Sequence, residues 1–553
     1  MKENSERDPS NLFVLTCLRS LDLPHSGKYL PRSIGKMIHL RHLNLSFCRQ
    51  LTCLPKSISN LVNLQTLRLT GCENLKFPGD IITKFVKLRW LDITYCKALD
   101  DGMPMGLGKM ICMQRLSHFI VGNDDKEIKK AKLNELKDLN LRGRLAIEKL
   151  DSVRDVEEES KNVNLRTKKN LISLTLNWGD DPKMEKSDAM RLLENLRPHQ
   201  NLKTLEIDWY PGVCLSDWLV SCTNLVQLKL VEINNCQYLP VLEGFVSLKT
   251  LHITGMHNLE CIYYEGCSSS ANFFSSLEEL TIYSCESLKG WQREANVQNT
   301  RDNEWHGSLP PFSRLSALRI RNCPDLRCMP TFPNLVTRLE LVNSSMTPLV
   351  DTLSMSTIGL STSHDMTPSL SMLKSLDIGG METEALPEEW MQNLSSLKDL
   401  SIGGFSSLEK PFLHMRNLSA TLKRLTIDRL GDEDCNIQCQ DLCCLRSLQT
   451  ISFSYCDHLI ALPEWICDLQ SLRYMHISNC KSLELLPAEM SRLTTLQTLE
   501  LSGVPLLEDK CKGETGAEWP KIAHIPNITI INWFLVPTYI SKRRRPRRAC
   551  SAH

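Results

Sequence analysis

The stretch Leu40-Arg-His-Leu43-Asn-Leu45-Ser-Phe-Cys48 contains a phrase that returns throughout the chain. It consists of an apolar residue, two others, Leu, one residue, Leu or Ile, and often a Cys three residues later. Apolar residues that alternate in this way place their side chains on one face of a β-strand. Each copy of the phrase therefore predicts one short strand with a buried apolar face.

The phrase occurs in 17 clear copies, and two weaker copies near Met113 and Leu141 fill a long gap. The copy at Leu335 has one extra residue before Leu339 and Leu341. A period of about 20–29 residues built on this phrase is the signature of a leucine-rich repeat. The clear copies begin at Leu18, Leu40, Leu64, Leu88, Leu171, Leu202, Leu225, Leu248, Leu277, Leu315, Leu335, Leu373, Leu397, Leu422, Leu448, Leu472 and Leu496.

Such repeats must stack, because no single repeat can bury its own leucine face. The expected fold is an α/β leucine-rich-repeat solenoid, a horseshoe with a concave parallel β-sheet. Its return segments have apolar residues at spacings of three and four, as in Leu54 to Leu64, and several open with Leu-Pro. Since Pro suits the first turn of a helix, we expect short helices or 3₁₀ turns on the convex side.

The repeat accounts for most of the domain organisation. We expect a polar lead-in at 1–17, the solenoid at 18–510, a closing segment at 511–531 and a basic tail at 532–553. Within the solenoid, mixed charge predicts a helical insertion at about 151–198, with a second helix over 186–196. Polar residues predict loop insertions at about 289–314 and at about 343–369, the latter rich in Ser, Thr and Met.

Composition favours the cytoplasm. The chain has 553 residues, a formal net charge of +1 and 42% hydrophobic residues. Its polar start resembles no secretory leader, and no apolar run is long enough to span a membrane. Many of the 23 Cys occupy the inward-facing slot after the strand, as Cys48 does, which indicates reduced structural thiols. The basic tail at 542–548 predicts either nuclear access and acidic partners or an extension without a role.

A column of basic residues is the main candidate binding site. Nine copies carry Lys or Arg directly after the leading apolar residue, and stacking would align them on the concave face. They would either attract an acidic protein surface or keep an exposed sheet soluble. The nine residues are Arg19, Arg41, Arg89, Lys203, Lys249, Lys374, Lys398, Lys423 and Arg473.

Aromatic residues form a second candidate set. Phe47, Tyr95, Trp178, Trp209 and Tyr455 lie two residues after the phrase, and Trp90 lies within a strand. Aromatic side chains anchor many interfaces, but they equally pack turns against the next repeat. We expect packing for the five turn residues, and the sequence leaves both roles open for Trp90.

No catalytic or metal-binding motif appears. The cluster Cys435, Cys439, Cys443 and Cys444 has a spacing unusual for zinc and no nearby His. We find no H-E-x-x-H, no G-x-S-x-G and no phosphate-binding G-x-x-x-x-G-K-[ST] loop. The chain is therefore expected to be neither an enzyme nor a carrier of a metal or cofactor.

Three stretches resemble plant intracellular nucleotide-binding leucine-rich-repeat immune receptors of the coiled-coil class. They are residues 30–45, residues 141–202 and the stretch Gly516-Ala-Glu-Trp-Pro-Lys-Ile-Ala-His-Ile-Pro-Asn-Ile528. The resemblance implies the repeat region of such a receptor without its nucleotide-binding module, because the sequence has no phosphate-binding loop.

The expected function follows from this resemblance. It implies a non-catalytic recognition protein in plant defence that senses pathogen effectors or their host targets and regulates a nucleotide-binding switch. The expected partners are proteins: an effector, a guarded host protein or a nucleotide-binding module. We expect no nucleic acid, no membrane span and no small-molecule substrate. The alternative is a general intracellular scaffold for signalling proteins.

Overall fold

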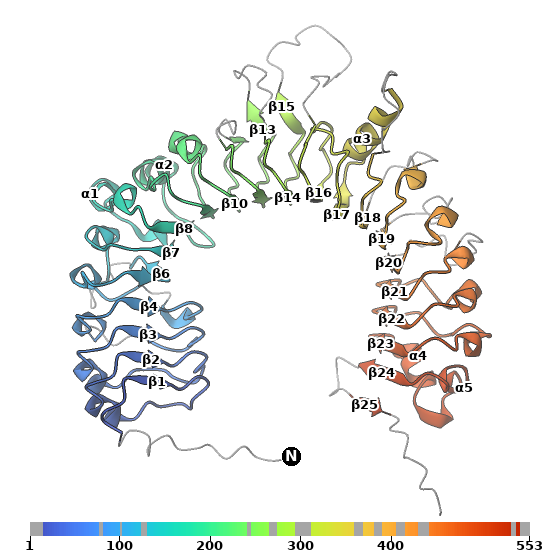
Figure 1. Ribbon diagram of the computed structural model, residues 1–553, viewed down its shortest axis with the longest axis horizontal. Helices are drawn as coiled ribbons and strands as arrows, with labels where there is room; N and C mark the ends of the chain where they lie inside the picture. Colours follow the sequence, from blue (N-terminus) through green and yellow to red (C-terminus); the bar gives the residue numbers. More distant parts are fainter. Residues whose placement is uncertain are drawn as a thin grey trace, which may run out of the picture. The chain divides into compact units, whose positions relative to one another are not determined.

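The computed structural model describes residues 15–76, 81–99, 102–122, 130–239, 245–264, 274–293, 311–358, 369–380, 390–404, 415–429, 442–531 and 538–541. It divides into two compact units. Unit 1 comprises Met1–Leu277 with Ser284–Asn303, and unit 2 comprises Glu278–Tyr283 with Glu304–His553. Each unit is a coil of repeats in which successive strands lie side by side (Figure 1).

Parallel strands follow one another through unit 1. Five of them form one sheet, and six later strands continue the series. The five are β1 (Ser20–Asp22), β2 (His42–Asn44), β3 (Thr66–Arg68), β4 (Trp90–Asp92) and β5 (Arg115–Leu116). The later strands are β6 (His118–Ile120), β7 (Gly143–Glu148), β8 (Leu171–Asn177), β9 (Thr204–Asp208), β10 (Gln227–Val231) and β12 (Thr250–Thr254).

Unit 2 repeats the same arrangement. Its strands pair in parallel, except for the last, which is antiparallel to the strand before it. They are β14 (Glu279–Tyr283), β16 (Ala317–Cys323), β17 (Arg338–Ser344), β18 (Ser375–Gly379), β19 (Asp399–Gly403), β20 (Arg424–Asp428), β21 (Thr450–Ser454), β22 (Tyr474–Ser478), β23 (Thr498–Ser502), β24 (Asn527–Ile531) and β25 (Thr538–Ser541).

Every predicted copy of the phrase has a strand, which confirms the repeat. Leu40, Leu43 and Leu45 are buried, as the alternating pattern requires. The two weak copies form β5 and β7, and the extra residue after Leu335 leaves Leu339 and Leu341 in the core. Residue-for-residue parallel pairing, such as Leu205 with Leu228, stacks each apolar position on its counterpart in the next repeat.

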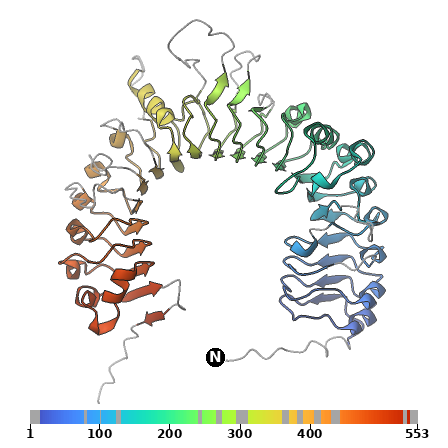
Figure 2. The same ribbon diagram turned by 180° about the vertical axis from the view of Figure 1, so that it is seen from behind.

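Short helices occupy the side of each coil opposite the strands, as the return segments predict (Figures 1 and 2). Pro31 directly precedes the first of them in the N-cap position. Unit 1 has η2 (Arg32–Lys36), η3 (Lys56–Asn60), η4 (Ile82–Lys84), η5 (Lys97–Leu99), η6 (Leu107–Lys109), η7 (Leu133–Leu136), η8 (Leu150–Ser152), η9 (Leu165–Thr167) and η10 (Asp217–Ser221). Unit 2 has η12 (Trp390–Asn393), η13 (Met415–Leu418), η14 (Leu442–Cys444), η15 (Glu464–Asp468), η16 (Met490–Arg492) and η17 (Gly513–Thr515).

The insertions differ in part from the expectation. The charged stretch at 151–170 holds only a short α-helix, α1 (Val156–Lys161), which packs against α2 (Lys186–Asn195). The stretch at 343–369, expected as a loop, contains α3 (Thr347–Ile358). Its apolar side chains Leu349 and Leu353 are buried, so packing overrides the Ser- and Thr-rich composition. The closing segment forms α4 (Pro505–Lys510), α5 (Trp519–Ile522) and β24.

A second, smaller parallel sheet in unit 1 was not expected. It consists of β11 (Tyr238–Leu239), β13 (Cys261–Tyr264) and β15 (Gly290–Arg293), the last within the predicted loop at about 289–314. Among the described residues, no helix combines the length and the apolar character that a membrane span requires.

The buried cysteines that follow the strands are structural thiols, as the sequence predicts. The Cys72 thiol donates to the backbone carbonyl of Leu45 at 3.0 Å, and the Cys96 thiol donates to that of Leu69 at 3.1 Å. Each thiol thus joins its turn to the strand of the preceding repeat. Burial raises the pKa of Cys96 to about 12, so this thiol stays protonated and remains a donor.

Candidate protein-recognition surface

The basic column exists as a physical row beside the strands. In unit 1 the backbone N–H of Arg41 donates to Arg19, that of Gln65 to Arg41 and that of Arg89 to Gln65, each at 2.8 Å. The side chains of Arg19, Arg41 and Arg89 are exposed. Further along unit 1, Lys203 and Lys249 occupy the same position with Val226 between them, and both are exposed.

Unit 2 carries its own part of the column. The backbone N–H of Lys398 donates to Lys374 at 2.9 Å, and that of Lys423 donates to Lys398 at 2.8 Å. Gln449 and then Arg473 continue the row through equivalent backbone bonds. The three lysines and Arg473 are exposed. The column is therefore a row of positions held at the spacing of neighbouring strands, about 4.8 Å, in which uncharged residues such as Gln65, Val226 and Gln449 separate some of the cations.

Trp90 belongs to the strand face and is not a core residue. It pairs with Thr66 on one side and with Arg115 on the other. The guanidinium carbons of Arg68 and Arg115 lie 5.5 Å and 5.4 Å from its ring centroid. Two cation–π contacts hold the indole in place, while its side chain stays partly exposed.

The turn aromatics do not share one environment. Trp178 is fully buried and meets Tyr210 edge to face, with ring centroids 5.0 Å apart, as expected for packing. Phe47, Tyr95 and Tyr455 are instead 42%, 72% and 53% exposed, although the Phe47 ring stacks on His25 with centroids 5.3 Å apart and the Arg429 guanidinium lies 5.8 Å from the Tyr455 ring centroid. Each has a positive φ near 55–60°.

Trp209 takes the same left-handed turn, with a φ of 58°, and is partly exposed. In other repeats this position is often Gly, as at Gly255 and Gly503, which adopts positive φ without strain. An aromatic residue at this position therefore adopts a backbone conformation that glycine prefers. The sequence pattern alone does not reveal that the turn has this conformation.

Strands β7 and β9 carry carboxylates that the basic column does not predict, Glu148 on the first and Glu206 and Asp208 on the second. Glu206 lies 3.6 Å from the Lys229 ammonium, and Asp208 accepts a 3.4 Å hydrogen bond from the Asn177 amide. Burial, together with repulsion from Glu206, raises the pKa of Asp208 to about 7. Glu206 and Asp208 lie four and six residues after Leu202, the leading leucine of their copy of the phrase. Residues at these two positions reveal the carboxylates, whereas the residue directly after the leading leucine, which defines the basic column, does not.

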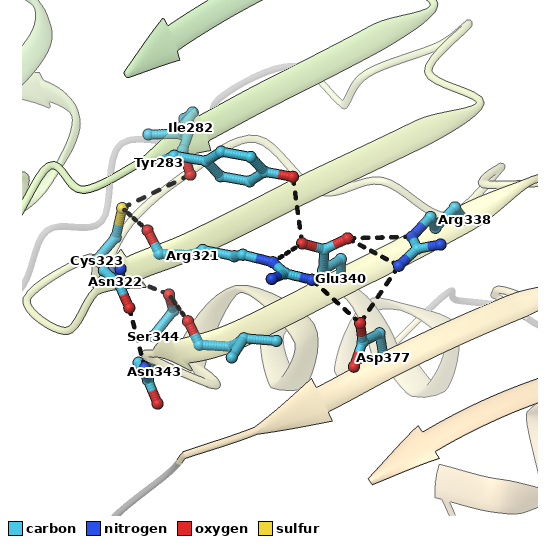
Figure 3. A network of polar contacts seen from close by, with 11 residues as sticks. Ile282, Tyr283, Arg321, Asn322, Cys323, Arg338, Glu340, Asn343, Ser344 and Asp377 are labelled. Atoms are coloured by element: carbon cyan, nitrogen blue, oxygen red, sulfur yellow. Dashed lines mark hydrogen bonds and ion pairs between the residues drawn. The ribbon is translucent and has the colours of Figure 1, made fainter. Parts of the chain in front are cut away.

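A network of charged side chains lies on the strand face of unit 2 (Figure 3). At its centre is Glu340 on β17, whose side chain is 2% exposed. Arg321 from β16 forms an ion pair with Glu340, and Arg338 donates to it from Nε at 3.1 Å. Both guanidiniums also reach Asp377 on β18, at 3.5 Å and 3.3 Å.

Tyr283 completes this network from β14. Its hydroxyl donates to the Glu340 carboxylate at 3.2 Å, and the Arg321 guanidinium lies 5.9 Å from its ring centroid. Burial and the charge of Glu340 raise the pKa of Tyr283, so the hydroxyl remains a donor. The buried carboxylate thus fixes two arginine side chains that are themselves 43% and 37% exposed. Arginine in this state offers preorganised donors to an anionic group of a partner.

The other predicted sites receive little structural support. Cys435, Cys439 and the tail at 542–548 lie outside the described residues. Cys443 and Cys444 are partly exposed, with their sulfur atoms 4.0 Å apart. The described part of the chain contains no group of three or more His, Cys, Asp or Glu able to hold a metal ion.

Comparison with known proteins adds sequence relationships to this geometry. A family model described as R13L1/DRL21 LRRs matches residues 133–256, and one described as Leucine Rich Repeat matches residues 39–61. The putative disease resistance protein RGA1 of Solanum bulbocastanum is 45% identical over 290 residues, which is 52% of this chain and 28% of that protein. The putative disease resistance protein RGA4 of the same species is 32% identical over 436 residues, covering 77% and 38% respectively.

A relative from Arabidopsis thaliana, the putative disease resistance RPP13-like protein 1, is 33% identical over 238 residues, 39% of this chain and 21% of that protein. The chain thus spans well under half the length of these curated relatives. Among solved structures, the Leptospira interrogans LRR protein LIC12759 matches 95% of this chain and 92% of that chain, at 17% identity and a TM-score of 0.30.

The repeat phrase, the stacked parallel strands and the family models define a leucine-rich-repeat protein. More particularly, its sequence matches the leucine-rich-repeat region of plant disease resistance proteins, which confirms the resemblance seen in the sequence.

Proposed function

We propose that this chain recognises proteins through its strand face in plant defence. The observation that carries the proposal is the row of exposed cations aligned by backbone hydrogen bonds, such as Arg19, Arg41 and Arg89 in unit 1. A row of this kind favours a partner with complementary negative charge, because electrostatic complementarity speeds association and selects among partners. The names of the relatives, all disease resistance proteins, support the setting.

Within that role, the partner is a pathogen effector or a host protein that an effector alters, and the chain regulates a nucleotide-binding immune switch. The Arg321–Arg338 network supports protein recognition in unit 2, because two partly exposed guanidiniums are held ready by Glu340 and Asp377. Trp90 supports it in unit 1 as an aromatic anchor between Arg68 and Arg115.

We also propose that the chain acts by binding and performs no catalysis, and that it works in the cytoplasm with possible access to the nucleus. The described cysteines are free thiols, and those that follow the strands serve as buried hydrogen-bond donors. Such thiols persist in a reducing compartment.

Charge reversal in the column tests the proposal. In Arg41→Glu/Arg89→Glu, two cations of one row become anions, so binding to an acidic partner surface weakens. The partner for the assay is the purified nucleotide-binding module of a receptor of the resembled class. We expect the Kd, measured by biolayer interferometry, to rise about tenfold or more, the effect of at least 1.4 kcal/mol. The loss should shrink in high salt.

The matched control is Lys56→Glu, a reversal at an exposed residue of η3 on the side opposite the strands. It should change the Kd less than about twofold, since a distant rim charge contributes little. An equal rise of the Kd in the control and in the double variant would contradict recognition by the strand face. The basic column would then serve only to keep the exposed sheet soluble. Binding of unrelated signalling proteins with equal affinity would favour the scaffold alternative.

A further inference from the structure

Unit 1 contains a hollow that lies apart from the strand column. It has a volume of about 650 Å³ and is lined by residues that follow β7 and β8 and by the first turn of α2. Its lining includes Lys149, Asp151, Gly179, Asp181, Lys183 and Asp188. This volume is in the range of small-ligand sites, about 300–1,000 Å³.

The hollow has a structural cause. Lys149, directly after β7, and Gly179, two residues after β8, have positive φ values of 59° and 97°. The chain then runs into η8 and α1 after the first turn and into α2 after the second, in place of the usual short return. Gly179 lies between the two turns: a Cβ built on it would be in ordinary van der Waals contact with Asp151 Oδ1, at 3.6 Å, and with Lys149 Nζ, at 3.7 Å.

The charges around the hollow are unbalanced. Its lining has five carboxylates, those of Asp151, Asp180, Asp181, Glu185 and Asp188, against three cations, Lys149, Arg154 and Lys183. Acidic groups thus outnumber basic groups by two, which favours a cationic ligand.

Asp151 is the group that the protein itself leaves unsatisfied. Its Oδ1 atom is buried and has no hydrogen-bond partner among the described residues. Burial raises the pKa of this carboxyl, and the nearby cations Lys149, Arg154 and Lys183 oppose that shift only in part. A buried acceptor without a donor costs stability, so its presence beside an open hollow points to a donor supplied from outside.

We propose that this hollow binds the guanidinium group of an arginine side chain presented by a partner protein, with Asp151 as its buried acceptor. A guanidinium offers five N–H donors in a plane and pairs with carboxylates in a bidentate manner, whereas an ammonium is a point charge that holds its water more tightly. The surrounding carboxylates of Asp181 and Asp188 complement the positive charge. The site is independent of the strand face, so its failure would not affect the function proposed above.

The test uses the full chain and a small probe, N-acetyl-L-arginine N-methylamide, followed by saturation-transfer NMR and calorimetry. The citrulline analogue has nearly the same shape without the charge, and the lysine analogue replaces the guanidinium with an ammonium. We expect saturable binding of the arginine probe, weaker binding of the lysine probe and none of the citrulline probe. Asp151→Asn should weaken arginine binding about tenfold or more, because it removes a charged hydrogen bond.

Asp138→Asn is the matched control, since Asp138 is exposed and does not line the hollow. It should leave the arginine affinity unchanged. Asp151→Asn should keep or raise the melting temperature, because burial disfavours the charged form, whereas a purely structural role predicts a lower one. If that variant did not fold, Asp181→Asn/Asp188→Asn would serve in its place with the same expected loss. Equal binding of arginine and citrulline probes, or unaltered affinity in both variants, would overturn the proposal.

Discussion

Single residues of the strand face have environments that the repeat pattern does not reveal. Asp208 is the clearest case, because neighbouring strands place Glu206, Glu148, Asn177 and Lys229 around it. The sequence predicts that residue 208 lies at a strand end, but the raised pKa depends on which side chains the adjacent repeats bring near. The same holds for Glu340, whose burial between Arg338 of its own strand and Arg321 of the preceding strand depends on the register of β16 and β17.

The raised pKa of Asp208 predicts a pH-dependent stability. Its carboxyl titrates at about 7 in the folded chain, against 3.8 for an unperturbed Asp. Between these values the folded state holds a proton that the unfolded state has lost, so this residue lowers stability as pH rises through the window. Asp208→Asn removes the charge and should stabilise unit 1 at pH 8 by at least about 1.4 kcal/mol, the value of one pKa unit.

Melting curves from pH 4 to pH 8 measure this effect, with Asp22→Asn, at an exposed carboxylate, as the control. The two variants should match the parent at pH 4, and only Asp208→Asn should gain stability at high pH. A loss of stability in Asp208→Asn at pH 8 would show that the ionised carboxylate is favourable in the fold.

At the scale of elements, the sequence predicts the strands well because alternation of apolar residues is a local property. It does not predict the bend at Ser117, where β5 ends and β6 begins and where Phe119 is buried while His118 is only partly so. Nor does it predict α3, since a Ser- and Thr-rich composition favours a loop until packing of Leu349 and Leu353 is known. Such elements depend on contacts between repeats and not on the phrase itself.

The strand register makes its own prediction. Leu205 on β9 is fully buried and pairs with Leu174 on β8 and Leu228 on β10. Leu205→Asp buries a carboxylate without a partner, which costs several kcal/mol, so β8, β9 and β10 should lose protection against hydrogen exchange. Because repeats interact mainly with their neighbours, distant strands should be affected less.

Lys203→Asp, two residues away and exposed, is the control and should leave exchange in β8 to β10 nearly unchanged. Unaltered protection in Leu205→Asp would mean that residue 205 does not face the core, contrary to the register seen for β9.

At the scale of the whole molecule, recognition of a partner depends on the charges and shapes of the exposed side chains that the repeats bring together. The sequence identifies one column of cations correctly in both units, because residues one repeat apart are brought together by stacking. It misses the carboxylates of β7 and β9 and the Arg321–Glu340–Arg338 network, since their members come from other positions of the phrase. The strand face therefore carries acidic as well as basic side chains.

The most direct measurement is hydroxyl-radical footprinting of the chain in complex with the nucleotide-binding module. Recognition by the strand face predicts protection of side chains on that face, with Trp90, Arg321 and Arg338 as indicator residues and at least one of the three protected. Exposed residues of η3 and η16, on the opposite side of each coil, should remain as reactive as in the free chain. A footprint confined to those short helices, with all three indicator residues unprotected, would contradict the account.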